Sequence, residues 1–329
     1  MQHHPRRTRS IASKLGASVL AVSTAITGAA WTATPASAGV AGVAGVAGTA
    51  AVTKAAPDAK IDIRAEFRKL ETAYQGHIGA YAIDTGTGRT VGNRAHERFP
   101  SNSTFKAILC GAILHKARTT DPGLMERTLK WKATDVVAHS PVTGVKENIE
   151  NGLTPERLCH ATITTSDNTA ANVLLKQIGG PAGMTRYYRS LGDPVGRLDR
   201  YETELNDWKP GERRDTIMPA FMARDLQKLT VGKALVPEDR SRLIGWMKDS
   251  TTGRERILAG LPKGWTVGDK TGTGGVYGTA SDLAIAWPPS GAPVIIAVYV
   301  RRGVADAQVD NGTIAKATSL LVRGLGHTS

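Results

Sequence analysis

The hydrophobic periodicity changes twice along this chain, and the order of the changes limits the possible folds more than any other feature. Five segments have the alternation or composition of strands, at residues 77–84, 89–94, 266–271, 279–287 and 293–301. Between the second and the third, from Thr104 to about Met247, the spacing of apolar residues is mainly helical. This order predicts an α/β (α+β) fold, with an antiparallel sheet built from both chain ends, flanking helices, and an all-helical lobe inserted between.

The predicted organisation divides the folded part into two lobes. The α/β lobe combines residues 61–94 with residues 248–329, and the all-helical lobe spans residues 95–247. Within the helical lobe, residues 197–219 break the pattern with charged and turn-forming residues, so we predict a long loop there. Loops of that length usually carry function, and a groove where two lobes meet is a usual place for a binding site.

The first 38 residues have the pattern of an export signal. Four cations precede a mostly apolar or small stretch from Leu15 to Trp31, and Pro35–Ala38 supplies a small-residue cleavage site. The alternative is a membrane span, but a span needs about 20 strongly apolar residues, and Ser, Thr and Gly interrupt this stretch. We therefore expect cleavage near Ala38, by the general or the twin-arginine route, and a secreted or extracytoplasmic protein without a stable membrane anchor.

Residues 39–60 and the overall charge limit the classes of structure and function that the chain can have. The segment repeats Gly, Val and Ala and has too few large apolar side chains to bury a core, so we predict a flexible linker. The net charge is +13, and loss of the signal segment's four cations lowers it to +9. Such charge can indicate nucleic-acid binding, but the basic residues are scattered among acids and aromatic residues make up only 5%. We predict no nucleic-acid partner and, because no His cluster has metal-ligand spacing, no metal and no cofactor.

Ser103 and Lys106 stand three residues apart at the start of an apolar stretch. If a helix begins at Ser103, the Lys nitrogen approaches the Ser oxygen on the same face, and desolvation lowers the proton affinity of the amine. A neutral amine beside a hydroxyl is one route to an activated nucleophile. The alternative is that Ser103 caps the helix and Lys106 is solvated, because Ser is a preferred N-cap residue. The pair alone leaves both interpretations open.

Two further motifs are equally ambiguous when each is taken alone. Residues 165–169, TSDNT, form a polar cluster between apolar helical stretches, which is typical of a helix cap. Residues 268–274, GDKTGTG, end a strand with a Lys among small residues. This second motif indicates either an edge strand that contains glycines or a backbone that approaches a ligand closely.

Taken together, the three motifs resemble a known family. Ser103-x-x-Lys106, Ser166-Asp167-Asn168 and Lys270-Thr271-Gly272, in this order, are the signature set of class A serine β-lactamases and penicillin-binding proteins. Longer stretches look like class A in particular: STFK, SPVTG, TITTSDNTAANVLL, RLDRYETELN, RRDTIMP, GLPKGW and DKTGTGGVYGT. The resemblance covers essentially the whole chain from residue 61. It implies a β-lactamase that hydrolyses the amide bond of penicillin- or cephalosporin-type antibiotics and so gives resistance.

The resemblance also implies a role for each motif residue. Ser103 would attack the lactam carbonyl and form an acyl-enzyme, while Lys106 and Ser166 would move protons. Glu202, which forms the family's ExxLN pattern with Asn206, would activate the water that deacylates the enzyme. Whether Lys106 or Glu202 is the base for acylation stays open. The other residues expected to bind substrate or line the site are Asn168, His139, Arg256, Lys270, Thr271, Gly272 and Thr273.

Two residue pairs are predicted to hold the structure together. Arg200 and Asp215 match the ion pair that closes the family's long loop, with a solvated surface pair as the alternative. Cys110 and Cys159 are the only two cysteines of the chain. An even count in an exported chain suggests one disulfide, although two buried thiols are the alternative. The positions of these cysteines match a disulfide known in class A.

Other functions fit part of the pattern. A D-alanyl-D-alanine peptidase would share the three motifs but should lack the loop that carries Glu202 and Asn206. A penicillin-binding receptor that stays acylated would need a membrane span to transmit its signal. We therefore predict a monomeric enzyme whose partner is a small-molecule β-lactam. The sequence leaves open which lactams are preferred and how the enzyme responds to inhibitors.

Overall fold

A five-stranded sheet forms the centre of the part of the chain that the computed structural model describes, residues 62–327. Its strands lie in the order β2-β1-β7-β6-β5, and every neighbouring pair is antiparallel. They are β1 (Gly76–Asp84), β2 (Thr90–Asn93), β5 (Thr266–Thr273), β6 (Ala280–Trp287) and β7 (Val294–Arg302). Because β1 pairs with β7 over its whole length, the predicted sheet built from both chain ends is confirmed. The predicted signal segment 1–38 and linker 39–60 lie outside the described residues.

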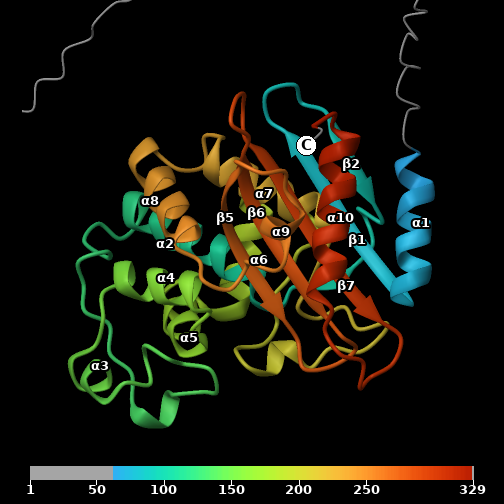
Figure 1. Cartoon of the computed structure of the whole chain (residues 1–329). Helices are drawn as coiled ribbons and strands as arrows, with labels where there is room; N and C mark the ends of the chain where they lie inside the picture. The colour runs from blue at the N-terminus through green and yellow to red at the C-terminus, as the bar shows by residue number, and fades with distance from the viewer. Residues whose placement is uncertain (1–61, 328–329) are drawn as a thin grey trace, which may run out of the picture. The chain divides into compact units, whose positions relative to one another are not determined.

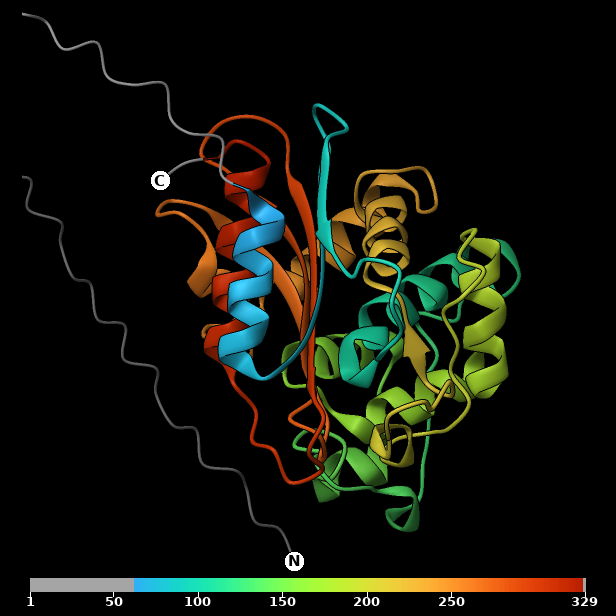
Figure 2. The ribbon, with the colours of Figure 1, turned by 90° about the vertical axis from the view of Figure 1, so that its right-hand side faces the viewer.

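Three helices cover one face of this sheet: α1 (Ile63–Tyr74), α9 (Ile257–Gly260) and α10 (Asn311–Gly324) (Figures 1 and 2). The side chain of Asp62 begins α1 by accepting a hydrogen bond from the Ala65 amide at 3.1 Å, as an N-cap residue does. Phe67 of α1 and Leu321 of α10 pack with strand residues in one apolar cluster. Helices on both faces explain why seven consecutive residues of β1 are buried, where a one-sided sheet would give alternation.

The helices that follow β2 and precede α9 lie on the other side of the sheet and form the helical lobe (Figure 2). They are α2 (Phe105–Thr119), α3 (Lys146–Asn151), α4 (Pro155–Thr164), α5 (Asn168–Gln177), α6 (Gly180–Ser190), α7 (Pro219–Thr230) and α8 (Pro237–Lys248). All residues from 101 to 114 are buried, so α2 is the central helix of the lobe, as expected for a helix that is apolar on all sides. The 3₁₀ turns η1 (Asn102–Thr104), η2 (Ala133–Asp135) and η3 (Glu204–Asn206) join these elements.

The lobe predicted as all-helical also contains a small sheet. β3 (Phe99–Pro100) pairs with β4 (Thr216–Ile217) and closes the base of the long loop predicted at residues 197–219. That loop is otherwise irregular apart from η3, and α7 begins at its last residue. Strands of two residues are too short to produce an alternating pattern, which is why the sequence did not reveal them.

Cys110 and Cys159, which the sequence pairs in a disulfide, are free thiols in this structure. Both are buried, one in α2 and the other in α4. Burial raises the pKa of the Cys159 thiol well above its usual value, and a hydrogen bond with Cys110 raises that pKa further. The predicted covalent bond is therefore absent from the structure, although the two side chains that it would join are in contact.

Within residues 62–327, no helix is both long enough and apolar enough to cross a bilayer. In the same part of the chain, no three His, Cys, Asp or Glu side chains gather as metal ligands would.

A buried acidic pair lies beneath the start of the long loop. Asp225 of α7 and Asp193, which follows α6, are each 1% exposed. The Asp193 carboxylate accepts hydrogen bonds from the Val195 and Gly196 amides and so shapes the entry to the loop. Burial, and then the charge of Asp193, raise the pKa of Asp225 to about 9. The Asp225 carboxyl group therefore keeps its proton at neutral pH in the folded state.

We expect Asp225→Asn to stabilise the protein at pH 8 and to have little effect at pH 4. In the unfolded chain an Asp ionises above about pH 4, whereas folded Asp225 stays protonated up to about pH 9. Between these values the folded state binds more protons, so stability falls as the pH rises, and Asn removes this penalty. The melting temperature at pH 8 should rise by at least about 2 °C, the shift that about 1 kcal/mol produces in a chain of this size.

The matched control for Asp225 is Asp239. Its side chain is just as buried but is paired with Arg118 at 2.8 Å. Asp239→Asn should lower the melting temperature at pH 8, because it leaves a guanidinium without its partner. An equal shift for Asp225→Asn at both pH values would contradict the assignment of a retained proton.

Candidate active site

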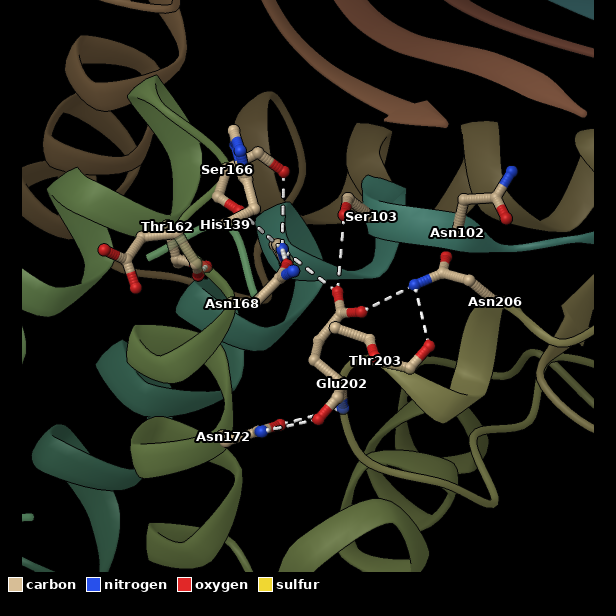
Figure 3. Close-up of polar contacts among 12 residues, drawn as sticks. Asn102, Ser103, His139, Thr162, Ser166, Asn168, Asn172, Glu202, Thr203 and Asn206 are labelled. Carbon is tan, nitrogen blue, oxygen red and sulfur yellow. Dashed lines mark hydrogen bonds and ion pairs between the residues drawn. The ribbon is translucent and has the colours of Figure 1, made fainter. Parts of the chain in front are cut away.

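Ser103 lies in the 3₁₀ turn η1, and α2 begins two residues later. The helix therefore does not begin at Ser103, the start that the pairing of Ser103 and Lys106 on one helix face assumed, and its N-cap position belongs to Thr104. The Ser103 hydroxyl donates to Oε1 of Glu202 at 3.3 Å, and Figure 3 shows the two groups pointing toward one another. The interpretation of Ser103 as a helix cap is wrong, because its hydroxyl contacts a carboxylate from the long loop.

Lys106 is completely buried on the first turn of α2. Its Nζ donates to the Ser166 carbonyl at 2.8 Å and to Oδ1 of Asn168 at 2.5 Å. It also forms an ion pair with Oε1 of Glu202 at 3.0 Å. Burial lowers the pKa of the Lys106 amine, and the Glu202 carboxylate opposes that shift. One of the two interpretations of the sequence brought this amine close to the Ser103 oxygen. In the structure the Glu202 oxygen contacts both groups and links them.

The Glu202 carboxylate is held on both of its oxygens. Oε1 contacts Ser103 and Lys106, while Oε2 accepts a hydrogen bond from Nδ2 of Asn206 at 2.8 Å (Figure 3). The backbone of Glu202 is fixed by Asn172, whose side chain accepts from its amide at 2.9 Å and donates to its carbonyl at 2.8 Å. The sequence prediction missed Asn172. It lies four residues after Asn168 on α5, and this spacing on one helix face was the available signal.

The pair Arg200 and Asp215 closes the base of the loop. Nε of Arg200 lies 2.6 Å from Oδ2 of Asp215, and their side chains are 18% and 1% exposed. The other Asp215 oxygen accepts from the amides of Asp199 and Arg200 at 2.7 and 3.0 Å. The predicted ion pair is thus confirmed, and the alternative of a solvated pair is wrong. Burial raises the pKa of Asp215, although the hydrogen bonds from Asp199 and Arg200 lower it.

The Ser166 hydroxyl accepts hydrogen bonds from two buried amines. Nζ of Lys106 lies 3.3 Å away and Nζ of Lys270 lies 3.0 Å away. With its oxygen occupied in this way, the hydroxyl keeps its own proton to donate toward the pocket. Asp167 fixes this turn as the N-cap of α5, since its side chain accepts from the Ala170 amide. Burial, and then the charge of Lys106, lower the pKa of Lys270 to about 7.

Strand β5 passes unusually close to Ser103. A Cβ at Gly272 would lie 2.5 Å from the Ser281 hydroxyl and 3.0 Å from the Ser103 nitrogen. Only glycine leaves enough room there, so of the two interpretations of this motif the structure favours close approach over a plain edge strand. The next residue, Thr273, accepts from the Arg256 guanidinium at 2.7 Å.

Arg256 was predicted to be an additional substrate-binding cation, and the structure corrects this in part. Its guanidinium donates to the Gly272 and Ser281 carbonyls, each at 2.8 Å, as well as to Thr273. The side chain is only 6% exposed, and burial lowers its pKa. Arg256 therefore braces the edge of β5 and presents part of its charge to the pocket, because most of its donors are already used.

A pocket of about 330 Å³ opens above Ser103. Its lining residues are mostly polar: Ser103, His139, Ser166, Asn168, Asn206, Thr252, Arg256, Thr271 and Thr273. The other predicted site residues, Lys106, Glu202, Lys270 and Gly272, lie in the wall beneath it. The structure thus brings every predicted catalytic and substrate-binding residue to one place. The cationic groups around this pocket favour an anionic ligand.

Two lining residues show how the rim is built. Nε2 of His139 contacts the Thr165 carbonyl at 2.8 Å, so its ring is held at the pocket mouth. Thr252, which the sequence prediction missed, shares a hydrogen bond of 2.7 Å with the Thr271 hydroxyl. Its local sequence, Ser-Thr-Thr-Gly, looks like an ordinary turn, and only the fold places it beside β5.

Residues 62–325 match the model of the "Beta-lactamase enzyme family". The chain is 48% identical over 260 residues to "Beta-lactamase AST-1" of Nocardia asteroides, covering 79% of this chain and 83% of that protein. A solved β-lactamase from Streptosporangium roseum is 55% identical, with a TM-score of 0.78, and covers 80% of this chain and 98% of its own. A solved class A β-lactamase from Clostridium kluyveri is 40% identical, with a TM-score of 0.76 and coverages of 80% and 98%.

Proposed function

Since the chain belongs to the beta-lactamase enzyme family, as a class A serine β-lactamase that hydrolyses β-lactam antibiotics and so confers resistance, we propose that Ser103 and Glu202 carry out the two halves of the reaction. The observation that carries this proposal is the contact of one carboxylate oxygen with both the Ser103 hydroxyl and the Lys106 amine. A single buried carboxylate is thereby in reach of the nucleophile and of a cation that stabilises its charge.

In the first half-reaction, the Ser103 oxygen bonds to the lactam carbonyl carbon and its proton passes to Glu202. The negative charge on the carbonyl oxygen is stabilised by the backbone N–H groups of Ser103 and Thr273, which the close approach of β5 supports. Losing one such donor typically costs about 100- to 1000-fold in rate. The carbon–nitrogen bond of the ring then breaks, and Ser166 gives its proton to the departing nitrogen. Ser166 takes a proton from Lys106 in return, and Lys106 takes the proton that Glu202 received, so Glu202 is ionised again.

In the second half-reaction, a water attacks the acyl carbonyl while Glu202 takes its proton as a general base. The bond between the acyl group and the Ser103 oxygen breaks, and that oxygen takes the proton from Glu202, which ends the cycle ionised. The hydrogen bond from Asn206 to Oε2 fixes the carboxylate orientation that this step requires. A receptor that stays acylated has no need of such a base, and a D-alanyl-D-alanine peptidase should lack the loop that carries Glu202 and Asn206, so we propose neither function.

Substrate binding follows from the polar rim. We assign the substrate carboxylate to Lys270, Thr271 and Thr273, because an ammonium group and two hydroxyls bind a carboxylate well. Asn168 faces the pocket and is suited to the side-chain amide of the antibiotic, while the His139 ring flanks the entrance.

The purified chain should turn over a chromogenic cephalosporin many times, equally well with and without a metal chelator. Multiple turnovers require the acyl bond to be hydrolysed, and a serine pathway needs no metal ion. Absorbance at the wavelength of the ring-opened product measures the rate. Stoichiometric acylation without turnover would point to a receptor or peptidase, and loss of activity in the chelator would refute the serine pathway.

We also propose that the enzyme is exported, cleaved after Ala38 and oxidised. The signal pattern supports cleavage, and the contact of two buried cysteine side chains supports a disulfide in an oxidising compartment. The mass of the exported protein should be that of a chain that begins at Gly39. It should be about 2 Da lower than that of the reduced chain, because disulfide formation removes two hydrogens. Light scattering in the same preparation should give a monomer. A mass that includes the signal segment would contradict cleavage, two free thiols would contradict the disulfide, and a dimer would contradict the monomeric state.

A further inference from the structure

Trp208 is the one inward-facing residue of an exposed stretch of the long loop. Its side chain is 4% exposed, whereas the neighbouring residues Asp207, Lys209 and Pro210 are all exposed. Aromatic side chains bury about 150–250 Å² each, so this contact is large for an irregular loop tip. Neither the motifs nor the proposed reaction gives this residue a role.

The ring of Trp208 contacts the turn between β5 and β6. It meets the Tyr277 ring edge to face, with centroids 5.7 Å apart and an angle of 83° between the planes. The Arg301 guanidinium at the end of β7 lies 5.5 Å from the Trp208 ring centroid. The indole nitrogen donates to the Glu212 carbonyl at 3.2 Å. Edge-to-face and cation–π geometries of this kind are attractive.

The surface that receives Trp208 is itself fixed. The Tyr277 amide donates to the Ala305 carbonyl at 2.8 Å, and its own carbonyl accepts from the Arg302 amide at 2.7 Å. Arg301 is paired with Glu97 at 2.6 Å. The loop tip is therefore attached to a braced part of the sheet. In Figure 1 this part of the loop lies near the lower ends of β5, β6 and β7.

The backbone of Trp208 is linked through Asn206 to the Glu202 carboxylate. The Trp208 amide donates to the Asn206 carbonyl at 2.9 Å, and Nδ2 of Asn206 donates to Oε2 of Glu202 at 2.8 Å. We propose that Trp208 is a positioning residue for deacylation: by packing on Tyr277 and Arg301, it holds Asn206, and through Asn206 it holds Glu202 in the orientation that activates water.

This inference rests on the proposed function and adds a structural cause to its second half. Acylation depends on Oε1 of Glu202, which the Lys106 ion pair holds independently of Asn206. Deacylation depends also on Oε2, whose partner is Asn206. Loss of Trp208 should therefore slow the second half-reaction far more than the first.

The test is Trp208→Ala, measured by rapid mixing with a penicillin and by intact mass. We expect the deacylation rate to fall about 10- to 100-fold, the cost of a misplacement of about 1 Å in a catalytic group, with acylation changed by less than about 3-fold by the same reasoning. The acyl-enzyme should then accumulate, and kcat and KM should fall together. Trp208→Phe, which keeps an edge-to-face ring, should restore most of the deacylation rate.

The control is Trp265→Ala. Trp265 is 9% exposed and packs against His327 at 5.1 Å between ring centroids, away from the loop. This variant should lose stability without a change in deacylation. Tyr277→Ala should reproduce the kinetic effect of Trp208→Ala, and the double variant should add little, as residues in contact do.

Each outcome bears on a different claim. If Glu202→Gln traps the acyl-enzyme but Trp208→Ala deacylates at the parent rate, the positioning role is refuted and the proposed function stands. The role also fails if Trp265→Ala slows deacylation equally or if Phe gives no rescue, because either result makes the effect one of general stability. If no variant and no parent enzyme ever carries an acyl group on Ser103, both proposals fall.

Discussion

Ser103→Ala is expected to lower kcat/KM for a penicillin by about five to six orders of magnitude, as loss of a serine nucleophile does elsewhere. The Ser103 hydroxyl is the one placed against the Glu202 carboxylate, at 3.3 Å. The other serine that lines the pocket, Ser166, has its oxygen engaged by two lysines, and in the proposed mechanism it protonates the leaving nitrogen. Hydrolysis rates and intact mass after incubation with a penicillin measure the effect.

The matched control for this prediction is Ser101→Ala. Ser101 is buried two residues earlier, and its hydroxyl donates to the Asn102 carbonyl instead of to a catalytic group. This variant should keep activity within about 10-fold, since only a neutral hydrogen bond is lost. A covalent adduct on Ser103→Ala, or comparable losses in both variants, would show that Ser103 is not the nucleophile.

Glu202→Gln has the second largest expected effect and should trap the acyl-enzyme. An amide cannot take a proton from water, so deacylation should slow by about 100- to 10,000-fold, the typical contribution of a general base. Acylation should continue at a reduced rate, because Lys106 loses its counter-ion and its pKa falls further. A neutral amine is then available to take the Ser103 proton. Mass spectrometry of the enzyme during turnover should show the adduct as the main species.

Glu204→Gln is the control within the same loop. Glu204 is the first residue of η3 and is exposed, so its charge should not affect deacylation. Unchanged turnover in Glu202→Gln would overturn the assignment of the base. Complete loss of acylation in that variant would show that Lys106 cannot replace Glu202 in the first half-reaction.

The elements of the fold were predictable wherever hydrophobic periodicity is long enough to read. The strands near residues 77–84 and 279–287 are such cases, because their composition is a local property. The order β2-β1-β7-β6-β5 was not predicted, since it depends on contacts between distant segments. The two-residue strands β3 and β4 were missed because they have no period.

The site shows a different division between what was predicted and what was not. Spacing alone left Ser103 and Lys106 ambiguous, and the assignment of Glu202 and Lys270 came from the family resemblance, not from local physics. Spacing also did not reveal that a carboxylate 99 residues after Ser103 contacts both the Ser103 and the Lys106 side chains. Thr252 was missed because only the fold brings its hydroxyl into hydrogen-bond distance of Thr271 on β5.

The position of Lys106 offers a route by which protons can move between the catalytic groups. In the proposed mechanism Glu202 receives a proton in each half-reaction, so it must give up the first before it can accept the second. Lys106 touches Glu202 at 3.0 Å and the Ser166 hydroxyl at 3.3 Å, and the side chains of Lys106 and Glu202 are fully buried. The proton taken from Ser103 can thus travel through Lys106 and Ser166 to the ring nitrogen without entering bulk water. In this mechanism acylation takes no proton from solvent, so its rate should not depend on the concentration of external buffer.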